Sequence, residues 1–437
     1  MKVKMRRILV ASILLLGIFC VAKAQNASHF TQPMAVSLQT LMDSAFQNNA
    51  IIKDNENKLR LAELNLKQSV AELASPKVYV QSDIMLAPYL NNNGGFISAK
   101  PGDKAIGYDV NMSNGGLYSA TANASLPLLT SAGKMAYRND CLAQKASFSN
   151  QIELTKHELT QQITNQYIVC YLSQVQITYV QNAINLLIDE KEVVKTLVVN
   201  GLAKQTDYLL MGIEIQNQQI NLAQYLSDYA DNFLQLKSLC GIKDSAVVII
   251  ATPNIEALHS NVDSKFLQMY KSDSLQIIAS QNVYNLKYKP SLNLYANTGL
   301  NAVELPGIQR KFGWSAGLTF NWMLYDGKQK QLEQQKNAIL LNTTETYKAS
   351  FLKQHDVQKV NALNKIKALE HIITQKKQQL QDFEEIMTMY KIQLSQGQLS
   401  VIDYLNAIRN YNDLLRDTTL AETNKMLAIN EYNYLNW

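Results

Sequence analysis

The sequence predicts an α+β protein made mostly of long helices, with four β-strands and an internal duplication. Residues 134–200 and 328–396 contain no glycine or proline, and their apolar residues recur at three- and four-residue spacing. This is the pattern of helices that bury one stripe of side chains. At 1.5 Å per residue each helix would be about 100 Å long, a length typical of coiled-coil packing. Four other stretches alternate between apolar and polar positions, as β-strands do.

The duplication is visible as one phrase that occurs twice. "GLAKQTDYLL" begins at Gly201 and "GQLSVIDYLN" begins at Gly397, so both read glycine, five residues, then Asp-Tyr-Leu. An upstream Gly-Lys pair also recurs, at 133–134 and 327–328, 68 and 70 residues before these two glycines. Long-period self-similarity predicts a structural repeat. We expect the first repeat at 25–240, a small mixed region at 241–263 and the second repeat at 264–437.

Each repeat is predicted to contain two strands, a long helix, a turn and a return helix. Gly201 and Gly397 would form the turns, because glycine adopts the left-handed conformation that ends many helices. A plain helix–turn–helix of any coiled-coil protein would also explain these two glycines. The expected elements are short helices including 51–75, strands 77–86 and 117–128, helices 134–200 and 202–239, helix 264–289, strands 291–300 and 313–323, and helices 328–396 and 399–434.

The four alternating stretches each have one apolar face and one face of small polar residues. Such strands suit a membrane-spanning sheet with lipid on one side and water on the other, and a half-buried soluble sheet is the alternative. Trp314 and Trp322 lie eight residues apart on one face, about 20 Å along a tilted strand and close to the spacing of two aromatic girdles. The residues expected to face lipid are Trp314, Leu318, Phe320, Trp322, Tyr118, Leu292 and Leu294.

Four strands would leave two open edges, and lipid cannot satisfy the hydrogen bonds of a strand edge. Membrane barrels contain at least about eight strands. Identical copies would therefore share one barrel, with eight strands from two copies or twelve from three.

The first residues predict export across a membrane. Four basic residues within 2–7 precede the apolar segment 8–21 and the small residues Ala22 and Ala24, which is the pattern of a secretory signal peptide at 1–24. An uncleaved anchor is the alternative, but the segment is shorter than the ~20 residues of a spanning helix. No later apolar run reaches that length, so we expect no membrane-spanning helix.

The composition excludes several functional classes. Five of the 41 basic residues lie within 1–24, so the rest of the chain has 36 basic and 36 acidic residues, a balance that offers no basic patch to nucleic acid. Three cysteines remain, Cys141, Cys170 and Cys240, which cannot all pair within one chain, and we expect them to be buried between helices. There is no metal-ligand spacing and no glycine-rich phosphate loop. We therefore expect no cofactor, no metal and no enzymatic activity.

The signal peptide, the duplicated halves and the Gly-x5-Asp-x-Leu phrase at both turns resemble the TolC-like outer-membrane efflux proteins. The resemblance covers essentially the whole chain after residue 24. It implies a homotrimer in the Gram-negative outer membrane, with a shared twelve-stranded transmembrane β-barrel and a coiled-coil α-barrel tunnel in the periplasm. Such a channel passively conducts substrates from an inner-membrane pump in multidrug efflux or type I secretion. The implied partners are outer-membrane lipid, a periplasmic adaptor (membrane fusion) protein and an inner-membrane RND or ABC-type transporter.

The resemblance also implies roles for residues near the two turns. Asp403 and Asn406 match positions where family members place acidic rings at the tunnel entrance, and Asp207 matches a residue that latches the closed tip. Three copies of Asp403 would repel one another and favour bound cations. Helix N-termini or exposed surface positions are the alternative for both aspartates.

The turns themselves, Gly201 and Gly397 with Leu202 and Leu399, would dock the adaptor. The family's latch partners, a tyrosine and an arginine, are replaced here by Leu394 and Leu399. The competing function is a soluble periplasmic coiled-coil scaffold or adaptor. It accounts for the long helices but not for four strands with lipid-like faces.

Overall fold

The computed structural model describes residues 35–86, 88–95, 100, 102–107, 118–258, 264–303 and 305–437. The expected signal peptide and the first residue of the second expected strand, Leu117, lie outside these residues. The described chain is mostly helical and contains a four-stranded antiparallel sheet, so the predicted α+β class is confirmed. None of the described helices has an apolar stretch long enough to cross a membrane.

Helices and strands follow one another in the predicted order, preceded by one further short helix. The helices are α2 (Leu38–Asn48), α3 (Ala50–Ala74), α4 (Ser131–Val199), α5 (Gln205–Leu239), α6 (Leu267–Tyr284), α7 (Gln329–Ser395) and α8 (Val401–Leu435). The strands are β1 (Lys77–Ile84), β2 (Tyr118–Pro127), β3 (Ser291–Ala302) and β4 (Phe312–Asn321), and the 3₁₀ helices are η1 (Asn285–Tyr288) and η2 (Ile308–Arg310).

The chain divides into two compact units, each assembled from three segments. The first unit holds the described residues up to Gln47 together with Gln162–Ile255 and Leu369–Leu427. The second holds Asn48–Gln161, Glu256–Ala368 and Ala428–Trp437. Because α4 and α7 run on without glycine or proline at their centres, each contributes one part to each unit.

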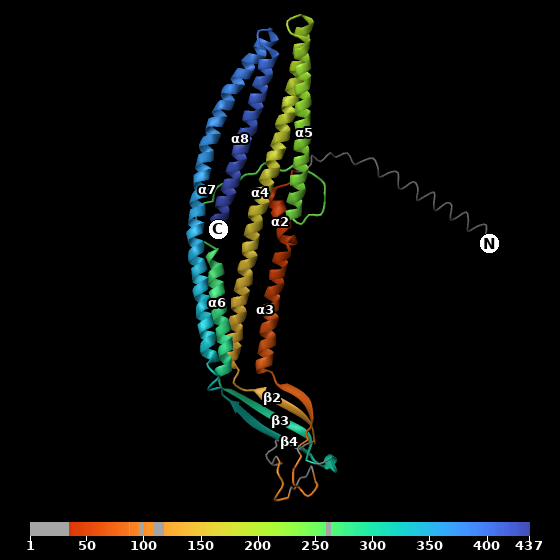
Figure 1. Ribbon diagram of the computed structural model, residues 1–437, viewed down its shortest axis with the longest axis vertical. Coiled ribbons are helices and arrows are strands. Elements are labelled where there is room, and N and C mark those ends of the chain that lie inside the picture. The colour runs from red at the N-terminus through yellow and green to blue at the C-terminus, as the bar shows by residue number, and fades with distance from the viewer. Residues whose placement is uncertain are drawn as a thin grey trace, which may run out of the picture. The chain divides into compact units, whose positions relative to one another are not determined.

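The first unit contains two antiparallel helical hairpins, in which α5 returns along α4 and α8 returns along α7 (Figure 1). Buried tyrosines fix the irregular segment that follows α5. The hydroxyl of Tyr167 donates to the carbonyl of Ala251 at 2.6 Å, and that of Tyr229 donates to the carbonyl of Val248 at 2.6 Å. A parallel bridge joins Val36 to Ile250 in the same region. Residues 241–255 are thus a small irregular layer against the helices of this unit.

The second unit contains the sheet and the helices that lead into it. α3 packs on α4, where the Cys141 thiol donates to the carbonyl of Ala62 at 3.4 Å, and α6 packs on α4, where Asn150 donates to the carbonyl of Gln268 at 3.2 Å. Gly133 lies inside α4, where an added Cβ would fall 2.3 Å from the Leu73 side chain. Glycine therefore allows α3 to approach closely.

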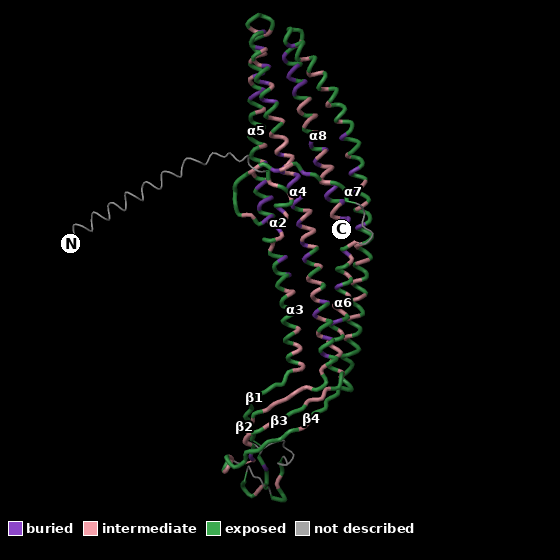
Figure 2. The backbone as a smooth tube through the Cα atoms, turned by 180° about the vertical axis from the view of Figure 1, so that it is seen from behind, coloured by how far each residue is buried: buried purple, intermediate pink, exposed green. Residues whose placement is uncertain are grey.

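The sheet has the strand order β1-β2-β3-β4, and all neighbouring strands are antiparallel. Directly paired residues point to the same face of a sheet. Leu294 pairs with both Leu126 and Leu318, and Ala122 pairs with both Val80 and Thr298. The apolar faces expected for the four strands therefore form one continuous face. β1 and β4 are exposed along almost their whole length (Figure 2).

Several predicted boundaries differ from the structure. β4 ends at Asn321, so Trp322 follows the strand and is not part of it. Asn321 pairs with Ser291, the first residue of β3 after Pro290, and no residue of β3 remains to pair with Trp322. The residue before a proline avoids the helical region, and the chain accordingly leaves α6 through the 3₁₀ turn η1 before Lys289.

The return helices also begin later than predicted, because the residues that follow each turn glycine belong to the turn and the helix cap. The two Gly-Lys pairs are not equivalent either. Gly133 is helical, whereas Gly327 has a φ of +70° and precedes α7. The described cysteines form no disulfide, and all three are buried.

Candidate functional site at the hairpin turns

Both hairpin turns use the same backbone geometry. Gly201 and Gly397 have φ angles of +72° and +70°, in the left-handed region that glycine tolerates. After α4, the N–H of Leu202 donates to the carbonyl of Leu197 at 2.8 Å, and the residue after Gly397 makes the same bond at 2.9 Å. These bonds close a Schellman turn, which satisfies carbonyls left open at a helix end. The repeated phrase in the sequence thus specifies one turn used twice.

Asp207 and Asp403 both lie in the first turn of the helix that follows. The Asp207 carboxylate accepts the backbone N–H of Lys204 at 3.0 Å. The Ser400 hydroxyl accepts the N–H of Asp403 at 3.1 Å and donates to the Asp403 carboxylate at 2.8 Å. Both aspartates therefore occupy helix-capping positions, where negative charge suits the positive end of the helix dipole. Asp403 remains exposed to solvent, and Asp207 is partly buried.

The other residues predicted at the tips lie close to these aspartates. Asn406 lies one turn after Asp403 on the exposed side of α8. Leu202 is exposed at the first turn. A Cβ added at Gly397 would lie 3.6 Å from the Cβ of Leu202, so the two turns contact each other.

An apolar cluster joins the two hairpins below their turns. Its buried members are Leu187, Val194, Met211, Ile215, Leu394, Val401, Tyr404, Leu405 and Ile408. Leu394 is fully buried, and Leu399 packs against the cluster from a partly buried position. Burying a leucine side chain stabilises a fold by roughly 2 kcal/mol. The two positions at which the family resemblance implies polar latch residues therefore contribute apolar packing here.

Two ion pairs cross between the same hairpins. Lys391 Nζ of α7 lies 2.8 Å from Glu190 Oε1 of α4, and Arg409 Nη2 of α8 lies 2.6 Å from Glu214 Oε2 of α5. In each pair the carboxylate belongs to the first hairpin and is buried, with side chains 1% and 3% exposed. The cationic partners belong to the second hairpin and are 57% and 50% exposed. Removing either cation would leave a buried carboxylate without its counter-charge.

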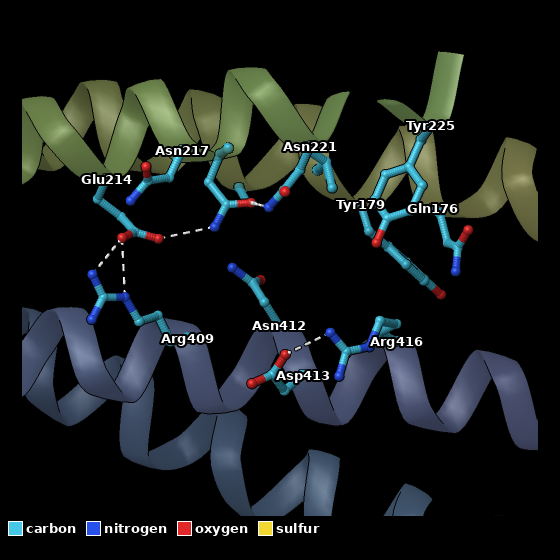
Figure 3. Close-up of a pocket in the computed structure, with 13 residues that line it drawn as sticks. Gln176, Tyr179, Glu214, Asn217, Asn221, Tyr225, Arg409, Asn412, Asp413 and Arg416 are labelled. Atoms are coloured by element: carbon cyan, nitrogen blue, oxygen red, sulfur yellow. Dashed lines mark hydrogen bonds and ion pairs between the residues drawn. The ribbon is translucent and has the colours of Figure 1, made fainter. Parts of the chain in front are cut away.

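Glu214 has the more complete set of partners (Figure 3). Arg409 donates to Glu214 Oε2 through Nε at 3.0 Å and through Nη2 at 2.6 Å, and Gln218 donates to Oε1 at 2.9 Å. Burial acts to raise the pKa of Glu214, but these hydrogen bonds and the charge of Arg409 outweigh it, so the pKa lies below its ordinary value of 4.5. In the other pair, the Glu190 carboxylate raises the pKa of Lys391. The lowered pKa of Glu214 and the raised pKa of Lys391 both favour the charged forms of these two side chains at neutral pH.

A polar cavity of about 310 Å³ lies beside the Glu214–Arg409 pair. Figure 3 shows Asn412 and Arg416 of α8 on one side of it and Asn217, Asn221 and Tyr225 of α5 on the other. Asn412 Nδ2 is buried and has no hydrogen-bond partner among the described residues. The cavity is large and polar enough to hold several water molecules, which could satisfy this amide.

Sequence reasoning did not find these two ion pairs. Glu214 and Arg409 are separated by 195 residues, and periodicity within one helix does not show which other helix it will meet. The available signal was local, since Glu214 lies between Ile213 and Ile215 in an otherwise apolar run. A charged residue in such a run is retained in a fold only when a partner or water reaches it.

The residues predicted to face lipid share the apolar face of the sheet, apart from Trp322. Trp314, Leu318 and Phe320 are 82%, 62% and 61% exposed. Leu294 is exposed, whereas Tyr118 and Leu292 are partly covered. Trp322 is exposed immediately after β4. Large apolar side chains in one continuous exposed patch indicate an interaction surface.

The opposite face of the sheet is polar and hollowed. A depression of about 1120 Å³ is lined by residues of all four strands, among them Gln81, Asn123, Asn297 and Ser315. Across the described ranges, no group of three or more His, Cys, Asp or Glu residues is close enough to bind a metal ion.

No protein-family model and no curated protein sequence matches this chain. Its structure, in contrast, is similar to solved outer-membrane channels. A CusC structure, reported for conformational changes in folding and transmembrane channel formation, has a TM-score of 0.68 at 13% identity and covers 91% of this chain and 92% of that one. VceC, an outer-membrane protein of Vibrio cholerae, has a TM-score of 0.67 at 15% identity and covers 91% and 96%.

The open state of the MtrE outer-membrane channel of Neisseria gonorrhoeae has a TM-score of 0.65 at 12% identity, covering 91% of this chain and 88% of that one. At such identities the similarity concerns the fold, and it extends over both hairpins and the sheet. The chain therefore has the fold of the TolC-like outer-membrane channel proteins.

Proposed function

We propose that this chain is the outer-membrane exit duct of a tripartite efflux or type I secretion system. It would conduct substrates passively from an inner-membrane pump across the periplasm and the outer membrane, without catalysing a reaction. The fold supports this role, because VceC and MtrE are an outer-membrane protein and an outer-membrane channel. Its partners would be a periplasmic adaptor protein and an inner-membrane RND or ABC-type transporter.

The observation that carries this proposal is a small sheet with an exposed apolar face and two unpaired edges. Among the described residues, β1 and β4 each pair with a single neighbouring strand, and lipid cannot satisfy the free N–H and C=O groups of a strand edge. Three copies would close these edges in one twelve-stranded barrel, a permitted strand number. The apolar face would contact lipid and the polar face would line a water-filled lumen. A soluble scaffold gives this exposed face no role.

The equivalence of the two hairpins supports an internal duplication. Each half supplies two strands, one long helix and one return helix. In each half the turn glycine is left-handed and the aspartate six residues later lies in the first turn of the return helix. A tunnel built from three such chains would have six similar hairpins around its axis.

In this assembly the hairpin turns would form the tunnel entrance. The exposed Asp403 would form a ring of three carboxylates, with Asn406 beside it and Asp207 behind it. The turns at Gly201 and Gly397, with Leu202 and Leu399, would meet the adaptor. In place of polar side chains at Leu394 and Leu399, the pairs Glu190–Lys391 and Glu214–Arg409 would hold the hairpins together.

Single-channel recording of the detergent-purified protein in a planar bilayer tests this function, with and without a trivalent cation on the helix side. Discrete current steps are expected, and the cation should block them. Steps without block would retain the channel and remove the Asp403 ring from its entrance. Absence of steps from a folded sample that stays soluble without detergent would instead favour the periplasmic scaffold.

A further inference from the structure

Basic side chains are concentrated at the end of the sheet that joins the helices. Four connecting segments, 72–77, 127–138, 284–291 and 321–330, meet there, because Lys77 lies opposite Ser125 and Ser291 lies opposite Asn321. Together they contain seven basic and two acidic residues, an excess of five. The basic collar consists of Lys77, Lys134, Arg138, Lys287, Lys289, Lys328 and Lys330. The chain outside 1–24 is neutral as a whole, but it has a local excess of positive charge at this end of the sheet.

The charges of the basic collar are not neutralised within the chain. All seven side chains are exposed, and none forms an ion pair with another described residue. Asp326 follows β4 in the sequence. Its carboxylate accepts hydrogen bonds from the hydroxyl of Tyr288 and from the backbone N–H of Lys330, the latter at 3.0 Å. The collar can therefore bind external anions.

Two lysines of the collar are held on a pair of tyrosines. The hydroxyls of Tyr284 and Tyr288 lie 3.3 Å apart. Lys287 Nζ lies 4.4 Å from the centre of the Tyr284 ring, and Lys330 Nζ lies 5.0 Å from that of Tyr288. Cation–π contacts of this kind orient an ammonium group without neutralising it. Two ammonium groups from different helices are thus held on two neighbouring rings, whose centroids lie 6.0 Å apart.

Exposed apolar residues accompany the collar. Trp322, Met323, Leu324 and Tyr325 are four consecutive exposed residues between β4 and Asp326, and Met135 is exposed beside Lys134. Aromatic residues mixed with lysines are typical of the level at which a bilayer changes from hydrocarbon to headgroup, where lysine stems lie along apolar surface and their charges reach water. This zone borders the apolar face of the sheet directly.

We propose that the basic collar binds the phosphate groups of anionic phospholipids in the leaflet on the helix side of the membrane. This inference rests on the proposed membrane location of the sheet. The lipid headgroup is favoured over a soluble acidic partner because the charges continue into exposed apolar residues and the apolar sheet face. A headgroup phosphate at Lys287 and Lys330 would place its acyl chains beside these residues.

The test uses the full assembled protein in vesicles that contain phosphatidylcholine with a minor fraction of phosphatidylglycerol. The lipid retained after gentle detergent extraction is counted by native mass spectrometry. The collar variant carries Lys287→Gln, Lys289→Gln, Lys328→Gln and Lys330→Gln. The matched control carries Lys53→Gln, Lys353→Gln, Lys365→Gln and Lys367→Gln, four exposed lysines of the same compact unit. A third variant replaces the four collar lysines by arginine, which keeps the charge.

Wild type, control and arginine variant should retain phosphatidylglycerol in preference to phosphatidylcholine. The collar variant should lose this preference, by about fivefold for each lysine that contacts a headgroup, and high salt should weaken it in the wild type. Unchanged preference in a glutamine variant that still enters vesicles would overturn the inference and leave the channel function intact. If no protein floats with vesicles, the channel function and the inference fail together.

Discussion

The two ion pairs at the hairpin interface each join a buried carboxylate to a half-exposed cation. Glu190 and Glu214 are almost completely buried, whereas Lys391 and Arg409 are about half exposed. Removing only the cation leaves an unpaired charge in the interior. This lowers the free energy of unfolding more than replacing both partners of the pair does. Each ion pair between the hairpins thus adds little net stability, but removing one of its partners destabilises the fold.

We expect Arg409→Ala to lower the free energy of unfolding by roughly 2 kcal/mol, less than the 3–5 kcal/mol of fully buried pairs because Arg409 is half exposed. Denaturant unfolding in detergent measures this. Arg416→Ala is the matched control, since its partners Asp413 and Asp417 are about half exposed, and it should cost less than about 0.5 kcal/mol. Equal losses in the two variants would contradict the importance of the buried Glu214.

The same pair predicts a pH dependence. Because the pKa of Glu214 is lowered in the folded state, the stabilisation is complete above the ordinary value of 4.5 and is lost as the pH falls through the lowered pKa. The difference in stability between wild type and Arg409→Ala should therefore shrink in acid. A difference that grows as the pH falls would show that Glu214 is not the titrating group.

In the proposed trimer, Asp403 predicts a charge effect at the tunnel entrance. Asp403→Asn should weaken block by a trivalent cation about tenfold or more, because three carboxylates are removed at once. Single-channel recording measures the blocking concentration. Asp207→Asn is the control, because Asp207 has the same capping position but is partly buried. If cation block weakens equally in both variants, the weakening comes from the altered helix caps and not from loss of an Asp403 ring.

The helices and strands show which structural features local sequence can predict. The long helices follow from residues 134–200 and 328–396 without glycine or proline, and the shared apolar face follows from strict alternation, because both are properties of a single segment. The predicted strand 313–323 extends too far, because a strand ends where its partner ends and β3 begins only after Pro290, so Trp322 follows β4. The ion pairs Glu190–Lys391 and Glu214–Arg409 likewise depend on which helices meet.

The turns predict opposite effects of alanine at different glycines. Gly201→Ala and Gly397→Ala should each lower the free energy of unfolding by about 1 kcal/mol, because alanine is strained at positive φ. Gly212→Ala is the control, because Gly212 lies within α5 and an added Cβ would meet only the mobile end of Lys191 at 3.4 Å. This variant should gain about 0.5–1 kcal/mol. Destabilisation at all three positions would contradict the assignment of the turns.

The two faces of the sheet predict opposite sensitivities to charge. Leu318→Arg or Phe320→Arg should impair membrane insertion, since arginine at mid-depth on the lipid face costs ~2–4 kcal/mol. Thr319→Arg is the control, because Thr319 pairs with Asn293 on the polar face. The fraction of protein that floats with membranes measures insertion. If the Leu318 variant inserts normally and the Thr319 variant does not, the face that carries Thr319 contacts lipid and the proposed orientation is wrong.

The whole molecule leaves large apolar surfaces uncovered in a single copy. Besides the sheet, α7 exposes Ile339, Tyr347, Val357 and Val360, and α5 exposes Ile220. The continuous apolar face of the sheet is the kind of patch that is rare on proteins that act alone. Native mass spectrometry of the detergent-solubilised protein should therefore detect an assembly of three chain masses. An assembly of two chain masses would be consistent with a shared barrel but would contradict the trimer. A single chain mass from folded protein would contradict both.

The division of each compact unit among three segments restricts when this protein can fold. The first unit needs residues up to Leu427, and the second is completed by Ala428–Trp437. Neither unit can form while the last part of the chain is still being synthesised. Folding of either unit therefore follows synthesis of the chain and does not accompany it.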